Sequence, residues 1–532
     1  MSEFEGKLVD LYLVSPRSLA VVLGDLEVAG MGSCPEGDLN ILLVVIDTLR
    51  ADHLGCSGNL KVQTPVMDRL AREGVRFTRA FTHIPITGPS HTTLFTSRYA
   101  SEAGVRNNGQ AIPYEESCLA EAMQYAGRST FGFISMTVLG KSFHFDQGFE
   151  VYRDELPPPW MLSAVEVNAR VEEELLNHPR ETFFAFVHYC EPHEPYSSHG
   201  LSECRVMARR GDEWLAEADI DREIGLSFKT VLAPGVNPIR FSSQREFRLR
   251  GCSVEPRPNG LRQIPGSGWK RDGRGILSTR DAELAFHVPG EETTEVTIHA
   301  VFSEILSETE SRRNYALEVE AVDTALGELL ERFEAAGLLE RTLVILTSDH
   351  GESLGEHGHM GHVEQLYDPL MAVPLILRFP DGRHAGRTVE DLAALSDIPP
   401  TVFDLLDIVP PSKPRGISLL PLIEGNGKGE GRALFLETYR PEAREDKVGI
   451  RTPFRKLIRT LGAETEEVYD LQNDPGEQVN ILERDPLTNE KLRLLLAEQL
   501  GEGAAGPEAP TPRESFLDED AKEALKALGY FR

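Results

Sequence analysis

The chain has few cysteines, and none of them stands in a metal-binding or redox spacing. Six cysteines are scattered among 532 residues without a CxxC pair, so the sequence predicts neither a disulfide framework nor a zinc knuckle. A run of about 18 apolar residues is also lacking, which argues against a membrane-spanning helix. The first residues, MSEFEGKLVD, lack the basic and then apolar order of a signal peptide. We therefore expect a cytoplasmic protein, with export left open if the true start of the chain differs.

The chain also lacks an excess of basic residues. Its 55 lysines and arginines face 85 aspartates and glutamates, which gives a formal net charge of -30. Such a charge repels nucleic acids and anionic membranes, so we expect no nucleic-acid partner. A small anionic substrate is still compatible with it, because a bound cation or a helix end can reverse the field inside a site.

Apolar runs that alternate with helical patterns indicate an α/β fold. Residues 40–46, NILLVVI, are continuously apolar, as in a strand buried on both faces of a parallel sheet. Similar strands are expected at 129–135, 182–187, 342–348 and 373–378. Thr64 and Pro65 predict the start of a helix that ends near Gly74, and apolar residues three and four apart predict another over 313–336. We therefore expect a doubly wound, mainly parallel sheet.

The pattern changes along the chain in a way that predicts four parts. Residues 200–305 carry short alternating runs separated by Pro and Gly, which indicates a β-rich insertion such as a small sandwich. The other parts are an N-terminal extension with strands at 1–36, a catalytic core at 37–200 and 306–430, and a smaller C-terminal α+β subdomain at 431–532. Within the last part, 501–515 is typical of a flexible tether and 518–528 of a closing helix.

Two of the predicted strands end in acidic residues. Asp47 follows VVI, and Asp349 and His350 follow ILTS. Sites in open α/β sheets form at the carboxyl ends of strands, so these three side chains are expected to lie together. Two carboxylates and an imidazole suit one divalent cation, such as Ca²⁺, Mg²⁺ or Mn²⁺, and Zn²⁺ is also compatible. The alternative is that each aspartate only caps the helix that follows it.

The stretch PITGPSHTTLFTS, residues 85–97, places a hydroxyl at the start of a predicted helix. Pro89 suits the first turn, and Thr87 or Gly88 suits the N-cap region. Free backbone N–H groups and the helix dipole would then face whatever lies beside Thr87, and this arrangement binds phosphate or sulfate. A threonine hydroxyl that coordinates a cation can lose its proton and attack. A threonine that only caps the helix is the alternative.

Histidines gather in two further stretches. HYCEPHEPY contains His188 and His193, and GEHGHMGH contains His357, His359 and His362. A lone histidine in a loop is usually a surface residue, but the second stretch follows directly on a metal-type aspartate. Histidine has a pKa suited to protonating a leaving alkoxide or to stabilising charge on a transferred group.

Several motifs, in one order, resemble those of the sulfatase family, which belongs to the alkaline phosphatase superfamily. They are NILLVVIDTLRADHLGCSG, TPVMDRLAREGVRFTRAF, TGPSHTTLFTSRYASEAGVRNNG, HYCEPHEPY, TSDHGESLGEHGHMGH and VPLILRFP. The likeness covers roughly 37–200 and 306–482 and skips the insertion and both ends. It implies an alkaline phosphatase-like fold and an enzyme that acts on anionic esters.

The resemblance also implies roles for individual residues. Asp47, Asp349 and His350 would hold the metal, and Thr87 stands where sulfatases carry the cysteine or serine that becomes formylglycine.

Three more residues match positions around the transferred group. His193, in Pro-His-x-Pro, matches a histidine that assists the leaving group. His362 matches a lysine that contacts the transferred group, and Asn108 matches the asparagine of the GVxxN stretch, which contacts it as well.

The sequence departs from the sulfatase pattern at four positions. Threonine is not converted to formylglycine, so no formylglycine is expected and Thr87 would act as a plain hydroxyl. His91 replaces the arginine of Cys-x-Pro-Ser-Arg, Thr48 replaces the second aspartate of the N-terminal pair, and Ser135 replaces the lysine of Gly-Lys-Trp-His. A metal-bound threonine nucleophile is similar to that of lipoteichoic acid synthases, phosphoethanolamine transferases and nucleotide phosphodiesterases in the same superfamily.

We therefore expect a metal-dependent hydrolase of sulfate, phosphate or phosphonate esters. Thr87 would be both a metal ligand and the nucleophile, Asn108 and His362 would bind the transferred group, and His193 would protonate the leaving oxygen. Its substrate would be a small anionic ester, such as part of a sulfated or phosphorylated glycan or lipid. Two alternatives stay open: a phosphoryl-group transferase or phosphodiesterase of the same superfamily, and a non-catalytic glycan- or protein-binding relative with a decayed site.

Overall fold

The computed structural model describes residues 39–501 apart from short stretches within them. These stretches are 157–160, 177–181, 195, 197–204, 220–222, 258–260, 266–269, 272–276, 290–292, 305, 428, 430, 441–442 and 464. The predictions of strands within 1–36, and of a tether and closing helix beyond 501, therefore lie outside the described residues.

A nine-stranded sheet forms the centre of the molecule. In spatial order its strands are β18 (Arg387–Val389), β2 (Val75–Phe81), β17 (Ala372–Arg378), β14 (Thr342–Thr347), β1 (Asn40–Ile46), β5 (Phe183–Tyr189), β3 (Ser129–Phe133) and β4 (Val151–Arg153), with β19 (Ala393–Ala394) beside β2. The pairings are parallel except those of β17. The prediction of an α/β fold with a mainly parallel sheet is therefore confirmed.

Strand β17 was expected at 373–378 but runs against both of its neighbours. The segment between β14 and β17, residues 348–371, holds Asp349 and His350, which lie at the edge of the sheet where β14 ends. A strand that starts at the edge where the previous strand ended must run in the opposite direction. The strand was predictable from its apolar run, whereas its direction depends on a connection that does not cross the sheet.

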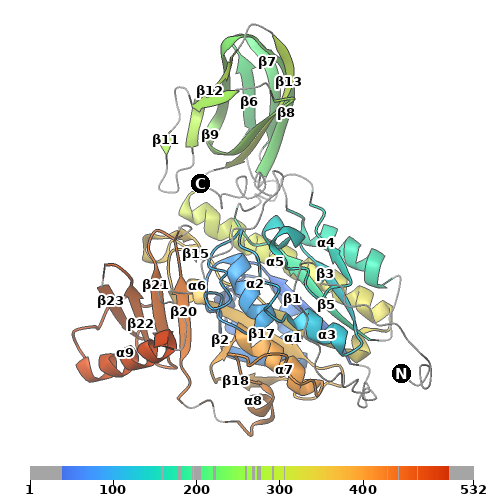
Figure 1. Ribbon diagram of the computed structural model, residues 1–532, viewed down its shortest axis with the longest axis vertical. Helices are drawn as coiled ribbons and strands as arrows, with labels where there is room; N and C mark the ends of the chain where they lie inside the picture. Colours follow the sequence, from blue (N-terminus) through green and yellow to red (C-terminus); the bar gives the residue numbers. More distant parts are fainter. Residues whose placement is uncertain are drawn as a thin grey trace, which may run out of the picture.

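Helices cover both faces of the sheet (Figure 1). One layer contains α2 (Thr87–Thr96), α3 (Leu119–Tyr125), α7 (Ile398–Leu405) and α8 (Leu420–Glu424), and the other contains α1 (Pro65–Glu73), α4 (Ala164–Val171) and α5 (Glu308–Ala335). Along β1, Leu43 packs in the first layer and Leu42 in the second. Burial on both faces explains why the β1 sequence is continuously apolar.

The helices predicted after Thr64 and over 313–336 are both present. Helix α1 begins at Pro65 and Gly74 follows its last residue, as expected. Helix α5 begins at Glu308, before the predicted residue 313, because Ser307 and Glu310 form a capping box. The remaining α-helix of the core described by the structure is α6 (Asp368–Met371). None of the described helices is long and apolar enough to cross a membrane.

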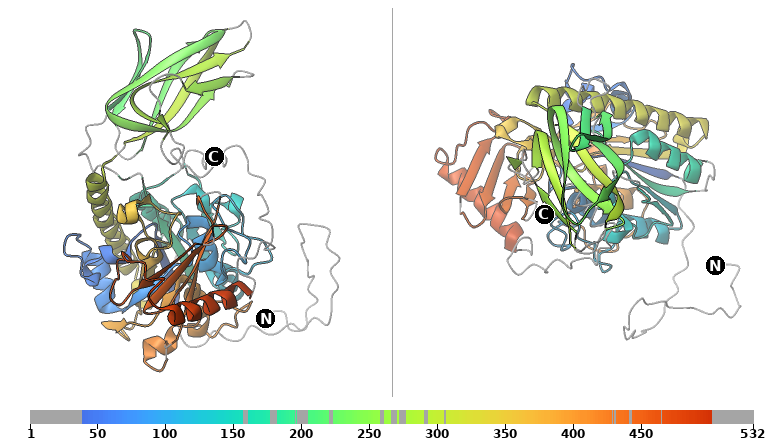
Figure 2. Two further views of the ribbon diagram at one scale, coloured as in Figure 1. Left: turned by 90° about the vertical axis from the view of Figure 1, so that its left-hand side faces the viewer. Right: turned by 90° about the horizontal axis from the view of Figure 1, so that it is seen from above.

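The β-rich insertion forms a separate antiparallel sheet that stands at one end of the molecule (Figure 2). Its strands are β6 (Arg205–Arg210), β7 (Glu213–Asp219), β8 (Glu223–Leu232), β9 (Gly235–Glu255), β10 (Arg262–Pro265), β11 (Lys270–Arg271), β12 (Leu277–Val288) and β13 (Thr294–Glu304). Phe241, Phe286 and Phe302 belong to a buried cluster formed by insertion residues alone. The insertion thus has its own apolar core.

The C-terminal α+β subdomain lies beside the α/β core (Figure 1). It consists of β20 (Leu434–Thr438), β21 (Lys447–Arg451), β22 (Arg455–Thr460), β23 (Thr465–Asp470) and α9 (Pro486–Gly501). Leu492 and Leu496 of α9 pack with Val448 and Leu457 of the sheet. A short antiparallel pair, β15 (Ser353–Leu354) and β16 (Met360–Gly361), follows β14 along the chain. The residue boundaries of the four predicted parts stay a prediction.

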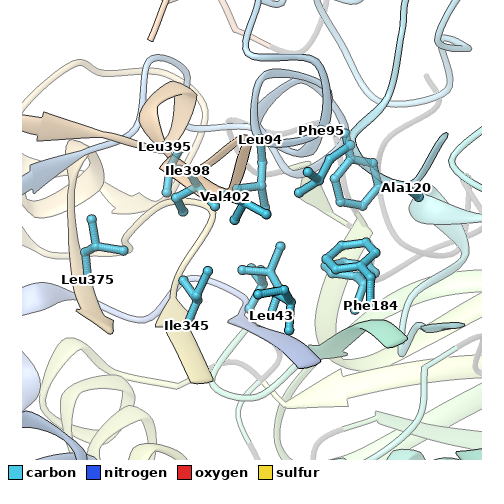
Figure 3. Packing of buried hydrophobic residues seen from close by; sticks show 14 of the residues in the cluster. Leu43, Leu94, Phe95, Ala120, Phe184, Ile345, Leu375, Leu395, Ile398 and Val402 are labelled. Carbon is cyan, nitrogen blue, oxygen red and sulfur yellow. The ribbon is translucent and has the colours of Figure 1, made fainter. Parts of the chain in front are cut away.

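Leu43 provides a test of this packing. It lies in β1, is fully buried and faces α2 (Figure 3). We expect Leu43→Ala to lower the free energy of unfolding by about 2–5 kcal/mol, because the lost side chain leaves a cavity between the sheet and the helices. Leu60→Ala is the matched control, since Leu60 is 88% exposed and its loss should change stability by less than about 0.5 kcal/mol. Urea unfolding followed by circular dichroism measures both, and equal effects would contradict the packing described.

Candidate active site

Three neighbouring parallel strands end at the site. In the sheet, Val45 of β1 is level with Thr347 of β14 on one side and with His188 of β5 on the other. Asp47 directly follows the end of β1, and Asp349 follows closely on β14. The register of the sheet therefore brings the two aspartates to one edge, as the sequence predicts.

Asp47, Asp349 and His350 form a compact group. Each offers one ligand atom, these atoms lie within 4.8 Å of one another, and all three side chains are fully buried. Neither carboxylate oxygen of Asp47 has a hydrogen-bond partner. Burial, together with the charge of Asp349, raises the pKa of Asp47 well above its ordinary value. Despite its burial, Asp349 has a lowered pKa, because His350, two further histidines and the hydrogen bond from a main-chain N–H favour its charged form.

The backbone fixes one oxygen of Asp349 and leaves the other for a ligand. Its Oδ1 accepts hydrogen bonds from the N–H groups of Thr48, at 3.2 Å, and His350, at 2.8 Å. The Ser90 hydroxyl donates to the main-chain oxygen of Asp349 at 2.7 Å. The buried Oδ2 has no hydrogen-bond partner, so it is the atom presented to a cation.

His350 has the tautomer that a metal ligand needs. Its Nδ1 lies 2.9 Å from the carbonyl oxygen of Gly351, which can only accept, so Nδ1 carries the proton and Nε2 has a free lone pair. Burial lowers the pKa of His350 to about 4, which keeps the ring neutral near pH 7. Its Nε2 lies 3.4 Å from Asp349 Oδ2 and 3.9 Å from Asp47 Oδ1. The donor set fits one divalent cation.

The turn after β1 is strained and is held in place by α5. Thr48 has a φ of 56°, in the left-handed region that β-branched residues avoid. The Tyr315 hydroxyl, from α5, donates to the Thr48 carbonyl at 2.8 Å and accepts from the Arg50 N–H at 2.9 Å. Strain of this kind persists where the surroundings enforce it, as at functional sites.

Thr87 is the first residue of α2 and lies beside the buried triad. Its Oγ1 is 3.4 Å from His350 Nε2, and the side chain is fully buried. The N-cap of α2 is Ile86, with extended backbone, which corrects the prediction of Thr87 or Gly88 in that role. The N-cap residue Ile86 makes no side-chain hydrogen bond to the helix, and the hydroxyl of Thr87 contacts His350 instead.

Asn108 changes the expected role of the helix N-terminus. Its Oδ1 accepts a hydrogen bond from the Gly88 N–H at 2.7 Å, and Pro89 has no N–H. The predicted set of free amides at this end is therefore largely absent, because Asn108 already binds one of them. A Cβ on Gly88 would lie 2.9 Å from Asn108 Oδ1, which explains why glycine stands there. With Oδ1 in this bond, Asn108 directs a donor, its amide NH₂, elsewhere.

The predicted histidines His193 and His362 lie in one row with His350. The ring centroids of His193 and His362 are 4.9 Å apart, and those of His362 and His350 are 4.7 Å apart. Nδ1 of His193 bonds to the carbonyl oxygen of Glu194. Burial and the neighbouring His362 hold the pKa of His193 well below its usual range.

Glu352 is a site residue that the sequence argument missed. It is fully buried, and its Oε1 lies 3.1 Å from Nδ1 of His362, which it orients. Its position in the stretch SDHGE, directly after the metal-type residues, was the available signal. His357 and His359 of the same stretch turn away, to stack on Tyr367 and to bond to Gln365.

Two more histidines, His188 and His91, also lie close to the aspartates. His188, at the end of β5, places Nε2 3.4 Å from Asp47 Oδ2, and its Nδ1 lies 2.8 Å from the Ser135 hydroxyl. His91 of α2 bonds through Nδ1 to the Thr87 carbonyl at 2.8 Å. Burial lowers the pKa of each ring to about 4. Where the sulfatase pattern has an arginine and a lysine, this chain thus has the neutral imidazole of His91 and the hydroxyl of Ser135.

The insertion contacts the residue that follows His193. Nη1 of Arg248, on β9, lies 3.2 Å from Oε1 of Glu194, and both side chains are largely buried. The β-rich module therefore touches the edge of the candidate active site.

Known proteins resemble this chain along most of its length. An N-acetylglucosamine-6-O-sulfatase of Bacteroides thetaiotaomicron is 24% identical over 513 residues, which are 90% of this chain and 89% of that protein. Iduronate 2-sulfatase of Mus musculus is 24% identical and covers 75% of each chain.

Solved structures share the fold. One, in complex with its substrate D-glucosamine-2-N,6-O-disulfate, has a TM-score of 0.61 at 20% identity and covers 87% of this chain and 98% of its own. The phosphonate monoester hydrolase of Agrobacterium radiobacter has a TM-score of 0.57 at 21% identity, with coverages of 87% and 95%.

Family models match almost all of the described residues. The model of the sulfatase family matches residues 39–408. The model of the N-sulphoglucosamine sulphohydrolase C-terminal region matches residues 355–504. The chain belongs to the sulfatase family, within the alkaline phosphatase superfamily.

Proposed function

We propose that the chain is a metal-dependent hydrolase of sulfate or of phosphate and phosphonate esters, with Thr87 as its nucleophile. The observation that carries the proposal is the place of Thr87. Its hydroxyl contacts His350 and lies fully buried beside Asp47 and Asp349. A buried hydroxyl next to a metal-type donor set has the chemistry of a nucleophile rather than that of a structural cap.

The first half of the reaction transfers the group to Thr87. Asp47, Asp349 and His350 would hold a divalent cation, which would act as a Lewis acid and make the neighbouring Thr87 hydroxyl easier to ionise. The Thr87 oxygen then forms a bond to the sulfur or phosphorus atom as the ester oxygen leaves. Asn108, with its amide NH₂, and His362, held by Glu352, bind the remaining oxygens of the transferred group.

His193 supplies the proton to the leaving oxygen. In the free protein its pKa is held low by burial and by His362. An anionic ester beside the ring stabilises the charged form and raises this pKa, so the residue gains its proton when substrate is present. In the second half, water attacks the sulfur or phosphorus atom, the Thr87 oxygen leaves, and His193 accepts the proton from the water.

The substrate class is supported by the relatives. One relative is named as an N-acetylglucosamine-6-O-sulfatase. One structure of similar fold contains a disulfated glucosamine as its substrate. We propose a sulfate ester on a sugar as the first substrate class to test. The alternative substrate class is phosphate and phosphonate esters. It is favoured by threonine at the nucleophile position and by the similar fold of a phosphonate monoester hydrolase.

A non-catalytic binding role fits the site less well. A buried pair of unpartnered carboxylates destabilises the fold. A protein whose active site had decayed would have no reason to keep such a pair. Asp47 and Asp349 are both retained with unpartnered oxygens, and Glu352 still orients His362.

The role of Thr87 can be tested by its removal. We expect Thr87→Ala to lower kcat/KM by about 10³-fold or more, because no other group at that place forms the covalent intermediate. Thr87→Ser is the matched control and should keep part of the activity. The assay uses aryl sulfate, phosphate monoester, phosphodiester and phosphonate substrates, with circular dichroism to check the fold. Full turnover by the alanine variant would rule out the covalent route.

The role of His193 predicts a dependence on the leaving group. We expect His193→Gln to slow hydrolysis of sugar and alkyl esters by about 10²–10⁴-fold. Hydrolysis of 4-nitrophenyl esters should change little, because 4-nitrophenolate leaves without a proton. His359→Gln is the control, since His359 bonds to Gln365 away from the site. An equal loss on both kinds of ester would show that His193 is not the proton donor.

The dependence on a cation is tested by chelation. We expect removal of divalent ions to abolish turnover, and readdition of Ca²⁺, Mg²⁺, Mn²⁺ or Zn²⁺ to identify the ion that restores it. Asp349→Asn should weaken retention of that ion, because the amide lacks the charge of the carboxylate. Elemental analysis of the purified protein gives the metal content, and undiminished activity in metal-free protein would contradict the proposal.

A further inference from the structure

Arg106 is a charged residue next to the candidate active site, and the proposed reaction does not use it. It lies two residues before Asn108, whose Oδ1 accepts a hydrogen bond from the Gly88 N–H at 2.7 Å. Between them, Nδ2 of Asn107 donates to the main-chain oxygen of Arg440, in the C-terminal subdomain, at 2.9 Å. The chain that follows Arg106 is therefore bound both to helix α2 and to the C-terminal subdomain.

The guanidinium of Arg106 lies over an aromatic ring that packs near the site. Its Cζ is 4.7 Å from the centroid of the Tyr439 ring. Tyr439 belongs to a small buried cluster that includes Ile86, and Val363 packs against this cluster. Ile86 directly precedes the proposed nucleophile, and Val363 directly follows the last histidine of the GEHGHMGH stretch. One ring thus links the guanidinium to the segments that carry these two site residues.

The guanidinium has N–H donors that bind no acceptor in the described part of the chain. Nε and Nη2 of Arg106 are buried and have no hydrogen-bond partner there. Two acidic groups close enough to interact with its charge are bound to other residues. Asp446 pairs with Arg440 at 3.0 Å. Glu437 accepts a hydrogen bond from the Tyr439 hydroxyl at 2.9 Å.

An arginine in this state is suited to bind an oxyanion. Its charge is permanent, and its planar fork of N–H groups matches two oxygens of a carboxylate or a sulfate. The alternative is a structural role, in which the stacking on Tyr439 holds the C-terminal subdomain against the core. Stacking uses the face of the guanidinium and leaves its N–H edges unused. The chain has 85 acidic residues for 55 basic ones, so carboxylate partners for an arginine are plentiful.

Arg106 lies at the edge of the site rather than at its centre. It is half-buried, whereas Thr87 and the triad of Asp47, Asp349 and His350 are fully buried. The reacting ester of a substrate must reach Thr87. A group that reaches Arg106 is therefore a different part of the same substrate molecule.

We propose that Arg106 binds a second anionic group of the substrate, a carboxylate or a sulfate separate from the ester that reacts. The proposal deepens the proposed function and rests on it, because the ester must lie at Thr87 while the second group reaches Arg106. It narrows the substrate class from any sugar sulfate to one that carries two anionic groups. Arg106 is then a specificity-determining residue, which holds the substrate and takes no part in making or breaking bonds.

Three sugars that differ in their second anionic group test the proposal. They are N-acetylglucosamine-6-O-sulfate, with one such group, D-glucosamine-2-N,6-O-disulfate, with a second sulfate, and a disaccharide of the first sugar with glucuronate, which adds a carboxylate. We expect Arg106→Gln to lower the ratio of kcat/KM for a doubly charged sugar over the singly charged one by about 10–100-fold, because a charge-assisted pair is lost. The loss should be mainly in KM. The sugar that shows it identifies the second group.

Arg440→Gln is the matched control for the loss of an arginine. Arg440 is 65% exposed and already pairs with Asp446, so this variant should keep the ratio of the unsubstituted protein. Arg106→Lys keeps the charge without the planar fork and should lower the ratio less. It also serves if Arg106→Gln fails to fold, as judged by thermal unfolding. An equal change on all three sugars, or no change on any, would overturn the proposal and leave the proposed function intact.

Calorimetry separates this proposal from the proposed function. If none of the three sugars is hydrolysed, the proposed function fails for sugar sulfates, and isothermal titration of the same sugars then decides the role of Arg106. Tighter binding of a doubly charged sugar, weakened about 10–100-fold by Arg106→Gln, would support an anion site at Arg106. Binding that Arg106→Gln leaves unchanged, or no binding of any of the three, would overturn it.

Discussion

The repulsion between two buried carboxylates is the constraint on which this site depends. Asp47 and Asp349 are fully buried at adjacent strand ends, and their charges oppose each other in a medium that screens them poorly. The surrounding structure holds them in spite of this: two main-chain N–H groups bind Asp349, and the Ser90 hydroxyl fixes its carbonyl. In the proposed function, a cation held between them compensates this repulsion.

Much of the fold could be predicted because the local sequence patterns agree with the burial that the complete fold imposes on them. The apolar run of β1 reflects burial on both faces, and Gly74 follows the end of α1 where expected. Strand β2 escaped prediction because its sequence, VRFTRAF, contains two arginines and lacks the continuous apolar run that identified the other core strands. The direction of β17 also could not be inferred, because it depends on where a long connection lies in space.

The site residues that directly follow the ends of core strands could be predicted from the sequence. Asp47, Asp349 and His350 needed only the parallel order of the sheet. The bond from Gly88 to Asn108 was not predictable, because it arises from the packing of a loop on a helix. The same holds for His91 and His188, whose approach depends on how α2 lies over β5.

Arg248 joins the inserted module to the loop that contains His193. The bond from Arg248 to Glu194 crosses between two separately folded cores. The bond fixes the side chain of the residue that directly follows His193. If the proposed function holds, a substitution of Arg248 would alter the surroundings of His193 from outside the α/β core.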